Sequence, residues 1–190
     1  MEVDEIERRF RVVDQMVTMY SVLRDRYSYC ATWLTLGILG SSVFLCAVTF
    51  LPDNALVVIG LSPFKTKIVL GTFSGLILFL SIAELKVDWK ERSRIYGEAA
   101  EKVAGLKSKY RDVRKSGKRP PPEIVQELAI QYDSTMASLP RVPDSQFAKL
   151  KAYHLKKIQL SQMIDRKPGC PLWILRLKLM WAGCCGKKKD

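Results

Sequence analysis

The chain has 190 residues, with 31 lysines and arginines against 19 acidic residues and 48% apolar residues, averages that would suit a basic soluble domain. The charge is segregated, however: residues 1–29 hold 5 basic and 6 acidic side chains, whereas residues 84–190 hold 24 and 12. Two stretches, 31–51 and 68–83, have no charged side chain. This pattern argues against a DNA-binding domain with a single basic face and favours a membrane protein with one positive side.

The first uncharged stretch is long enough to cross a bilayer. A helix over 31–51 (ATWLTLGILGSSVFLCAVTFL) rises about 1.5 Å per residue and covers roughly 30 Å, the thickness of the hydrocarbon core. It follows a charged segment that includes Arg24 and Arg26, so a cleavable signal peptide is a poor interpretation. The sequence predicts a transmembrane helix at 31–51.

The second uncharged stretch is shorter and lies between Lys67 and Glu84. Ser62 and Pro63 upstream are typical of a helix N-cap followed by proline at the first helical position. The sequence therefore predicts a second transmembrane helix over 64–85. The alternative is a buried core helix.

Two spans place both termini on the same side of the membrane, and the basic excess places that side in the cytoplasm. The linker 52–61 is too short for a third span and is expected to run along the interface. The cysteines are odd in number and form no disulfide framework, which favours a reducing compartment. They are Cys30, Cys46, Cys170, Cys184 and Cys185.

Apolar residues recur at steps of 4 and 3 before the first span and after the second, which predicts that both helices continue past the membrane as an antiparallel coiled hairpin. Counted outward from the membrane, Tyr27 is expected near Val87 and Ile6 near Lys107. The two seams are Ile6, Phe10, Val13, Val17, Tyr20 and Tyr27, and Leu85, Trp89, Tyr96, Ala99, Val103, Leu106, Tyr110 and Val113.

One arginine interrupts each seam near the membrane, Arg24 in the first and Arg92 in the second. Each has two interpretations. The arginines could pair with an acidic neighbour (Asp25, Asp88 or Glu91), or they could contact lipid phosphates.

Proline-rich breaks delimit the rest of the chain. The run SGKRPPP over 116–122 ends the long helix, and a third helix is predicted over 123–138. A fourth helix is predicted from Asp144 to about residue 165, capped by Asp144. The lone histidine, His154, is expected to be a packed or interfacial residue rather than a ligand.

Residues 166–190 form a tail after a second break at 167–171. The segment 172–181 is too short to span a bilayer, so it is expected to lie in the membrane interface. The alternative is docking on the protein's own helices or on another subunit. Cys184 and Cys185 are a candidate acylation pair. The side chains expected at the lipid interface are Trp173, Arg176, Lys178, Trp181, Lys187, Lys188 and Lys189.

No catalytic or metal-binding signature appears in the sequence. A single histidine gives neither a dyad nor a zinc cluster, and no spaced cysteine pairs are present. Phosphate-binding GxxxxGK[ST] and GxGxxG loops are absent. We therefore expect neither an enzyme nor a metal or cofactor.

The two spans carry small and hydroxylated residues in register, which allow helix backbones to approach closely and hydrogen-bond. They could pack within one hairpin, or they could drive oligomerisation with one stripe lining a water path. Glu84 lies at the cytoplasmic mouth, where an acidic ring would attract cations, unless it pairs with Lys86 or Arg26. The candidate pore-lining or helix-packing residues are Thr35, Ser42, Cys46, Thr49, Gly71, Ser74, Gly75 and Ser81.

This order of parts resembles the SLATT family, the SMODS- and SLOG-associating two-transmembrane effector domains. The resemblance covers roughly residues 5–165: an N-terminal helix, two spans, and an arginine- and tyrosine-bearing helix (LFLSIAELKVDWKERSRIYGEAAEKVAGLKSKYRDV) with further helices after it. It implies a membrane effector that forms pores or perturbs the membrane when activated. The chain departs from the family in its cysteine- and lysine-rich tail and in carrying no nucleotide-sensor domain, so a trigger would come from a separate sensor or regulatory protein or from oligomerisation itself.

Two functions of different classes follow from these features. The first is an oligomeric two-span protein that forms or gates a pore. The second is a membrane-anchored scaffold whose cytoplasmic helices bind partners. Nucleic acid is not an expected partner, because anionic lipid explains the basic charge more simply. The expected partners are therefore anionic membrane lipids and further copies of the chain.

Overall fold

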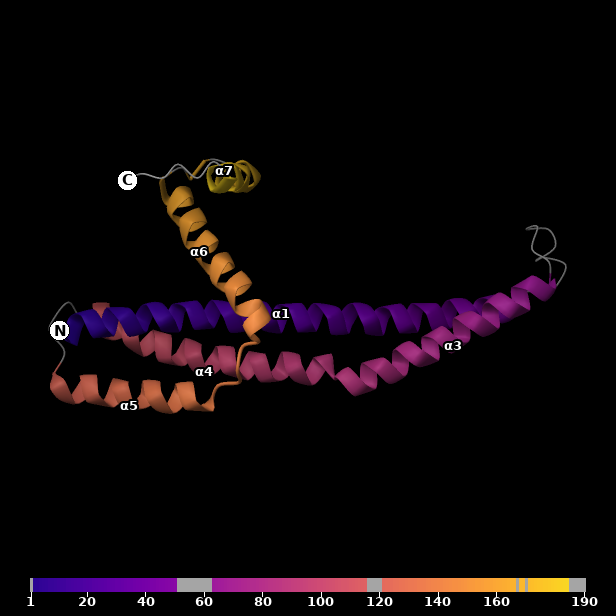
Figure 1. The fold of residues 1–190 in the computed structure, drawn as a ribbon, viewed down its shortest axis with the longest axis horizontal. Helices are drawn as coiled ribbons and strands as arrows, with labels where there is room; N and C mark the ends of the chain where they lie inside the picture. Colours follow the sequence, from indigo (N-terminus) through magenta and orange to yellow (C-terminus); the bar gives the residue numbers. More distant parts are fainter. Residues whose placement is uncertain (1, 51–62, 116–120, 167, 170, 185–190) are drawn as a thin grey trace. The chain divides into compact units, whose positions relative to one another are not determined.

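In the computed structural model the chain is all-helical, with no strand among the residues that the structure describes, which are 2–50, 63–115, 121–166, 168–169 and 171–184. The ends of the third and fourth predicted helices are confirmed to within a residue. The helices, shown in Figure 1, are α1 (Glu2–Thr49), α3 (Pro63–Val87), α4 (Trp89–Lys115), α5 (Pro122–Ser138), α6 (Asp144–Arg166) and α7 (Leu172–Cys184).

The chain divides into two compact units, and α1 and α4 each contribute to both. One unit comprises Met1–Val22 and Glu98–Asp190, and we call it the helical body. The other comprises Leu23–Gly97, and we call it the apolar unit.

The apolar unit contains the most apolar parts of two helices that are long and apolar enough to cross a membrane, Asp4–Thr49 and Phe64–Lys115. In the most apolar 18-residue window of each, only 6% and 0% of the residues are buried. A core helix of a soluble domain would be mostly buried, because burial of its apolar side chains is what stabilises it. The second apolar helix is therefore not a core helix of this chain.

Contacts within the apolar unit join α1 to α4. The Ser93 hydroxyl donates to the Arg24 carbonyl at 3.1 Å. The rings of Tyr27 and Tyr96 stack with centroids 5.5 Å apart. Ser93 and Tyr96 of α4 thus lie beside one short stretch of α1, from Arg24 to Tyr27.

This register differs from the one predicted from the sequence. Tyr27 stacks on Tyr96 rather than lying near Val87. In the helical body, Lys107 forms an ion pair with Asp14, and Ile6 instead lines a cleft together with Tyr110. The prediction assumed that both spans end at the same level. In the structure, Glu84 at the end of the second predicted span contacts Thr35, which lies inside the first predicted span, so this pair does not follow the predicted register.

The helix predicted to continue from the second span past the membrane is interrupted at Asp88. Asp88 has a left-handed φ of 45° between α3 and α4, a conformation that aspartate tolerates better than most residues. Its amide donates to the Glu84 carbonyl at 3.1 Å, and its Oδ1 accepts the Glu91 amide at 3.2 Å. One residue therefore closes α3 and caps α4.

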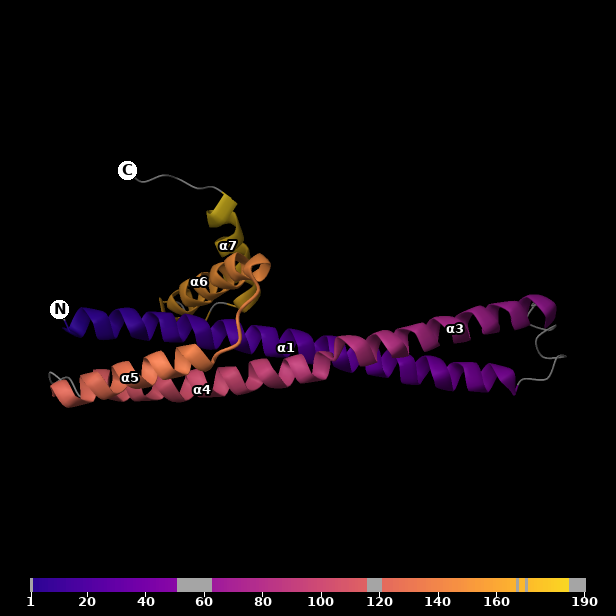
Figure 2. The ribbon, with the colours of Figure 1, turned by 60° about the horizontal axis from the view of Figure 1, so that its bottom comes forward.

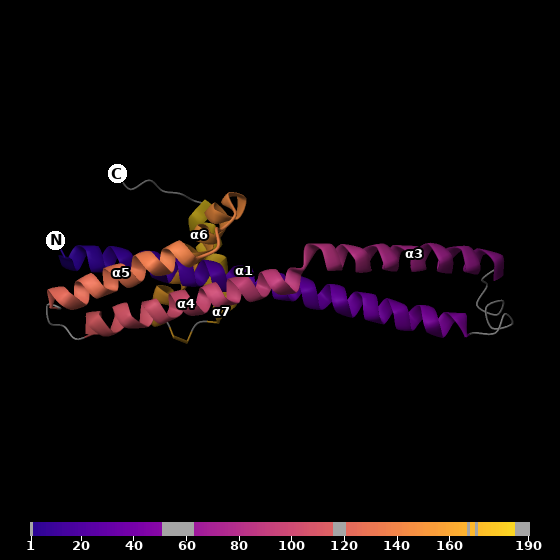
Figure 3. The same ribbon diagram turned by 90° about the horizontal axis from the view of Figure 1, so that it is seen from below.

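The helical body packs α1, α4 and α5 side by side, as Figures 2 and 3 show. The predicted seams form its core from α1 and α4, and α5 adds Leu128. The first seam is corrected at its C-terminal end, since Leu23 is fully buried whereas Arg24 is exposed. The second seam starts later than predicted, because Leu85 is 83% exposed. The buried core residues are Ile6, Val13, Met19, Tyr20, Ala99, Ala100, Val103, Leu106, Tyr110 and Leu128.

α6 attaches to the body through its first half. Leu150 and His154 are buried, and His154 Nδ1 lies 3.1 Å from Thr18 Oγ1. The Tyr20 hydroxyl donates to the carbonyl of Pro140, in the segment before α6, at 2.8 Å. The expectation that the lone histidine is a packed residue is thus confirmed.

Candidate functional site

Gly71 and Gly75 lie on the side of α3 that faces away from α1. At about 100° per residue, Gly71 and Gly75 are opposite Ile77, Leu80 and Glu84. Ile77 and Leu80 line a cavity together with α1 residues, so their face is the one that meets α1. A Cβ atom built on Gly71 or Gly75 would meet nothing within 4 Å. These glycines therefore do not bring the two helices of this chain together.

Three hydroxyl groups of the predicted spans donate to carbonyl groups of their own helices. Ser42 donates to the Ile38 carbonyl and Thr49 to the Leu45 carbonyl, both at 2.8 Å. Ser81 does the same on α3, at 2.9 Å from its carbonyl acceptor. Ser42, Cys46, Thr49 and Ser74 are exposed, whereas Thr35 and Ser81 are half-buried.

The two spans leave space between them. A cavity of about 170 Å³ separates α1 from α3, with the single glycine Gly37 in its wall. Such a void costs the helices the dispersion contacts that a close-packed pair would make. Its lining residues are Trp33, Leu34, Gly37, Ile38, Ser41, Ile77 and Leu80.

Glu84 contacts the hydroxyl group of a threonine. Its Oε1 lies 2.7 Å from Thr35 Oγ1, which is also 2.9 Å from the Ala31 carbonyl oxygen. The contact ties the end of the second predicted span to the first. Arg24, in turn, pairs with Asp25 at 2.8 Å, which agrees with the structural interpretation of that arginine.

The tail helix α7 has one buried side and one exposed side. Leu175 is only 3% exposed and lies on the side packed on α6, whereas Trp173 is 67% exposed. Arg176 and Lys178 are also exposed. The side chains of Trp181 and Cys184, and the residues Cys185, Lys187, Lys188 and Lys189, lie outside the described part of the chain.

Among the residues that the structure describes, no cluster of three or more histidine, cysteine, aspartate or glutamate side chains could hold a metal ion. The buried His154 has Asp14 as an acidic neighbour, with Nε2 3.9 Å from a carboxylate oxygen. Burial lowers the pKa of His154, and the Asp14 carboxylate opposes that shift.

One feature of the helical body was missed by the reasoning from sequence. A cleft lined by Glu5, Arg9 and Tyr110 opens between α1, α4 and α5. The charged pair looks like part of a solvated helix face in the sequence, and the apolar walls come from residues more than 100 positions apart. The only sign of this cleft in the sequence is the turn Glu5–Arg9, which mixes charged and apolar residues.

No protein-family model, curated protein or solved structure matches this chain.

Proposed function

We propose that this chain is an integral membrane protein that crosses the bilayer twice as an antiparallel hairpin, with both termini in the cytoplasm. In this proposal several copies associate into an oligomer that forms or gates a pore. The resemblance to SLATT domains supports an effector role in defence or signalling, with a separate protein as the sensor. The concentration of basic residues after position 84 supports the orientation.

The observation that carries the oligomer is the open glycine face of α3. Gly71 and Gly75 form a small-xxx-small pair, which in membranes mediates close helix contacts. A Cβ atom built on either glycine would meet nothing within 4 Å among the residues that the structure describes, and the pair faces away from α1. A second copy therefore supplies the helix that this surface accommodates.

Two further features favour a pore over an inert bundle. The cavity between α1 and α3 shows that one hairpin does not fill its own interface, so the spans can repack against other copies. The exposed hydroxyl groups of Ser42 and Ser74 offer a polar stripe for a water path. Glu84 then provides acidic charge at the cytoplasmic mouth.

The test is solute release from liposomes that contain the full chain. A Gly71→Leu/Gly75→Leu variant blocks the open face without a clash inside the chain, so it is expected to abolish both oligomerisation and release. Val43→Phe adds bulk at another exposed position, outside the small-residue face, and is the matched control. If the oligomeric wild type released no solute, the proposed pore would be contradicted. If the double variant still released solute, the proposed interface at Gly71 and Gly75 would be contradicted.

A membrane-anchored scaffold is the second candidate, and the internal hydrogen bonds of Ser42 and Thr49 favour it. Hydroxyl groups satisfied by their own helix need no water path and can face lipid. In this case the helical body binds partners and the spans only anchor it. Replacing both spans with unrelated ones would then preserve function, whereas the pore requires the native spans.

A further inference from the structure

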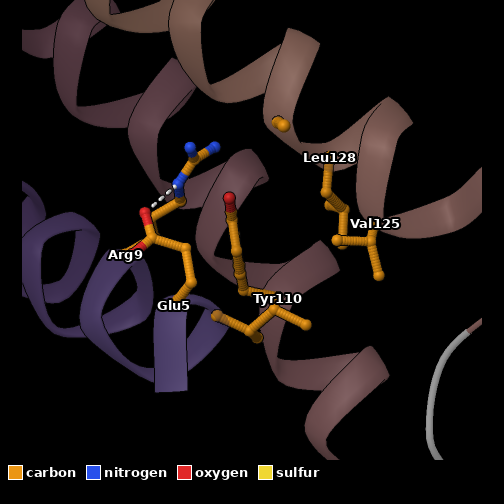
Figure 4. Close-up of a pocket in the computed structure, with 7 residues that line it drawn as sticks. Glu5, Arg9, Tyr110, Val125 and Leu128 are labelled. Atoms are coloured by element: carbon orange, nitrogen blue, oxygen red, sulfur yellow. Dashed lines mark hydrogen bonds and ion pairs between the residues drawn. The ribbon is translucent and has the colours of Figure 1, made fainter. Parts of the chain in front are cut away.

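The cleft of the helical body has the size and lining of a small-molecule site. Its volume is about 380 Å³, within the range of roughly 300–1,000 Å³ that ligand pockets occupy. Figure 4 shows Glu5, Arg9 and Tyr110 on one side and Val125 and Leu128 on the other. Such a mostly apolar cleft with a few polar groups suits an apolar ligand with one polar end. The full lining is Glu5, Ile6, Arg9, Tyr110, Val125, Leu128 and Ala129.

Charged side chains form the polar edge of the cleft. Glu5 Oε1 accepts a hydrogen bond from Arg8 at 3.0 Å and another from Arg9 at 2.9 Å. These two hydrogen bonds lower the pKa of Glu5, so it is a carboxylate at neutral pH. One carboxylate therefore faces two guanidinium groups.

Arg9 is the group of this cluster that a ligand in the cleft would meet. Its side chain is mostly buried, whereas that of Arg8 is mostly exposed and lies outside the cleft. The Arg9 guanidinium lies over the Tyr132 ring, 5.0 Å from its centroid. A guanidinium has five N–H donors, more than the hydrogen bond from Arg9 Nε to Glu5 uses.

We propose that this cleft binds a single-chain amphiphile with one carboxylate, such as a long-chain fatty acid. The alkyl chain packs against Ile6, Val125 and Leu128, and the carboxylate pairs with Arg9. Glu5 keeps Arg8 as its partner, so neither carboxylate is left without a guanidinium partner. A neutral lipid lacks this charge complementarity.

The test uses the full chain in phosphatidylcholine nanodiscs and a diazirine-bearing dodecanoate as the photolabel. Mass spectrometry of the peptides locates the label. Saturable labelling is expected in the segments that contain Arg9, Tyr110 and Leu128. Excess dodecanoate should compete for these segments and dodecan-1-ol should not, whereas labelling of the spans reports non-specific partition into the bilayer.

Matched variants separate the cleft from its surroundings. Ala129→Phe fills the cleft and Arg9→Gln removes the ion pair, and each is expected to weaken cleft labelling by about tenfold or more. Arg8→Gln should also weaken it, because Glu5 would then have only Arg9 as a partner. Ile130→Phe and Arg11→Gln change exposed neighbouring positions and should have no effect.

Several outcomes would overturn the proposal. These are label confined to the spans, equal competition by dodecan-1-ol, or labelling of the cleft by a diazirine phospholipid in place of the single-chain acid. Labelling that is unchanged in both Arg9→Gln and Ala129→Phe would do the same. Circular dichroism of each variant shows that it is folded, and the two substitutions act on different helices, so one misfolded variant does not decide the result.

Discussion

The hydroxyl group of Thr35 lies 2.7 Å from a carboxylate oxygen of Glu84, and this contact joins the two most apolar segments of the chain. Glu84 lies close to the end of α3, and its contact with Thr35 fixes which part of α1 lies beside that end. Polar contacts between apolar helices specify one alignment, since any shift leaves a polar group without its partner.

Thr35→Val is expected to destabilise the apolar unit by about 1–2 kcal/mol, because it leaves the Glu84 carboxylate without the hydroxyl. The measurement is unfolding in mixed micelles. Thr32→Val is the matched control, since Thr32 is exposed and donates to the Ser28 carbonyl of its own helix. An equal loss in the two variants would show that the contact between helices contributes nothing.

Asp88→Ala is expected to cost about 1–2 kcal/mol, because it removes the cap of α4 and places alanine at a left-handed φ. Asp88→Asn keeps both the cap and the tolerance of that conformation and should be close to wild type. Thermal unfolding followed by circular dichroism measures both. If alanine and asparagine behave alike, the cap has no energetic role.

The stability of the helical body is expected to fall as the pH drops below about 6.5, the ordinary pKa of histidine. Burial lowers the pKa of His154 in the folded state. As the pH falls, the imidazole is therefore protonated more readily in the unfolded chain, and this protonation favours unfolding. The loss levels off below the pKa of the folded state. His154→Gln should flatten the change between pH 7 and pH 6, and since it is the only histidine, an unaltered slope would assign the effect to other groups.

The register predicts which introduced cysteines can be joined by a short thiol cross-linker. In a background with the native cysteines replaced by serine, Tyr27→Cys with Tyr96→Cys should cross-link efficiently, because the two rings stack. Tyr27→Cys with Val87→Cys should cross-link poorly. A change in the gel mobility of the monomer reports an internal cross-link. If the pair at positions 27 and 87 cross-linked better than the pair at 27 and 96, the register predicted from the sequence would be correct instead.

The residue pattern was sufficient for the helices and most of their buried faces. Val13, Val103 and Leu106 are buried as the 4 and 3 spacing predicts, because a helix fixes which residues share a face. Arg24 was misplaced by one residue, since Leu23 is the neighbour that is buried. The break at Asp88 was missed because aspartate stops a helix only where its neighbours use its carboxylate.

The sequence by itself determined the helical class, the two apolar segments and the segregation of charge, because these depend on local periodicity and on length. Only the tertiary structure decided how the helices align, which side of α3 meets α1, and where a cleft opens around Arg9 and Tyr110. Alignment depends on pairs such as Thr35 and Glu84 that are distant in the chain, and many alignments satisfy the same apolar pattern. The open face of Gly71 and Gly75 likewise has meaning only once the packed face of the same helix is known.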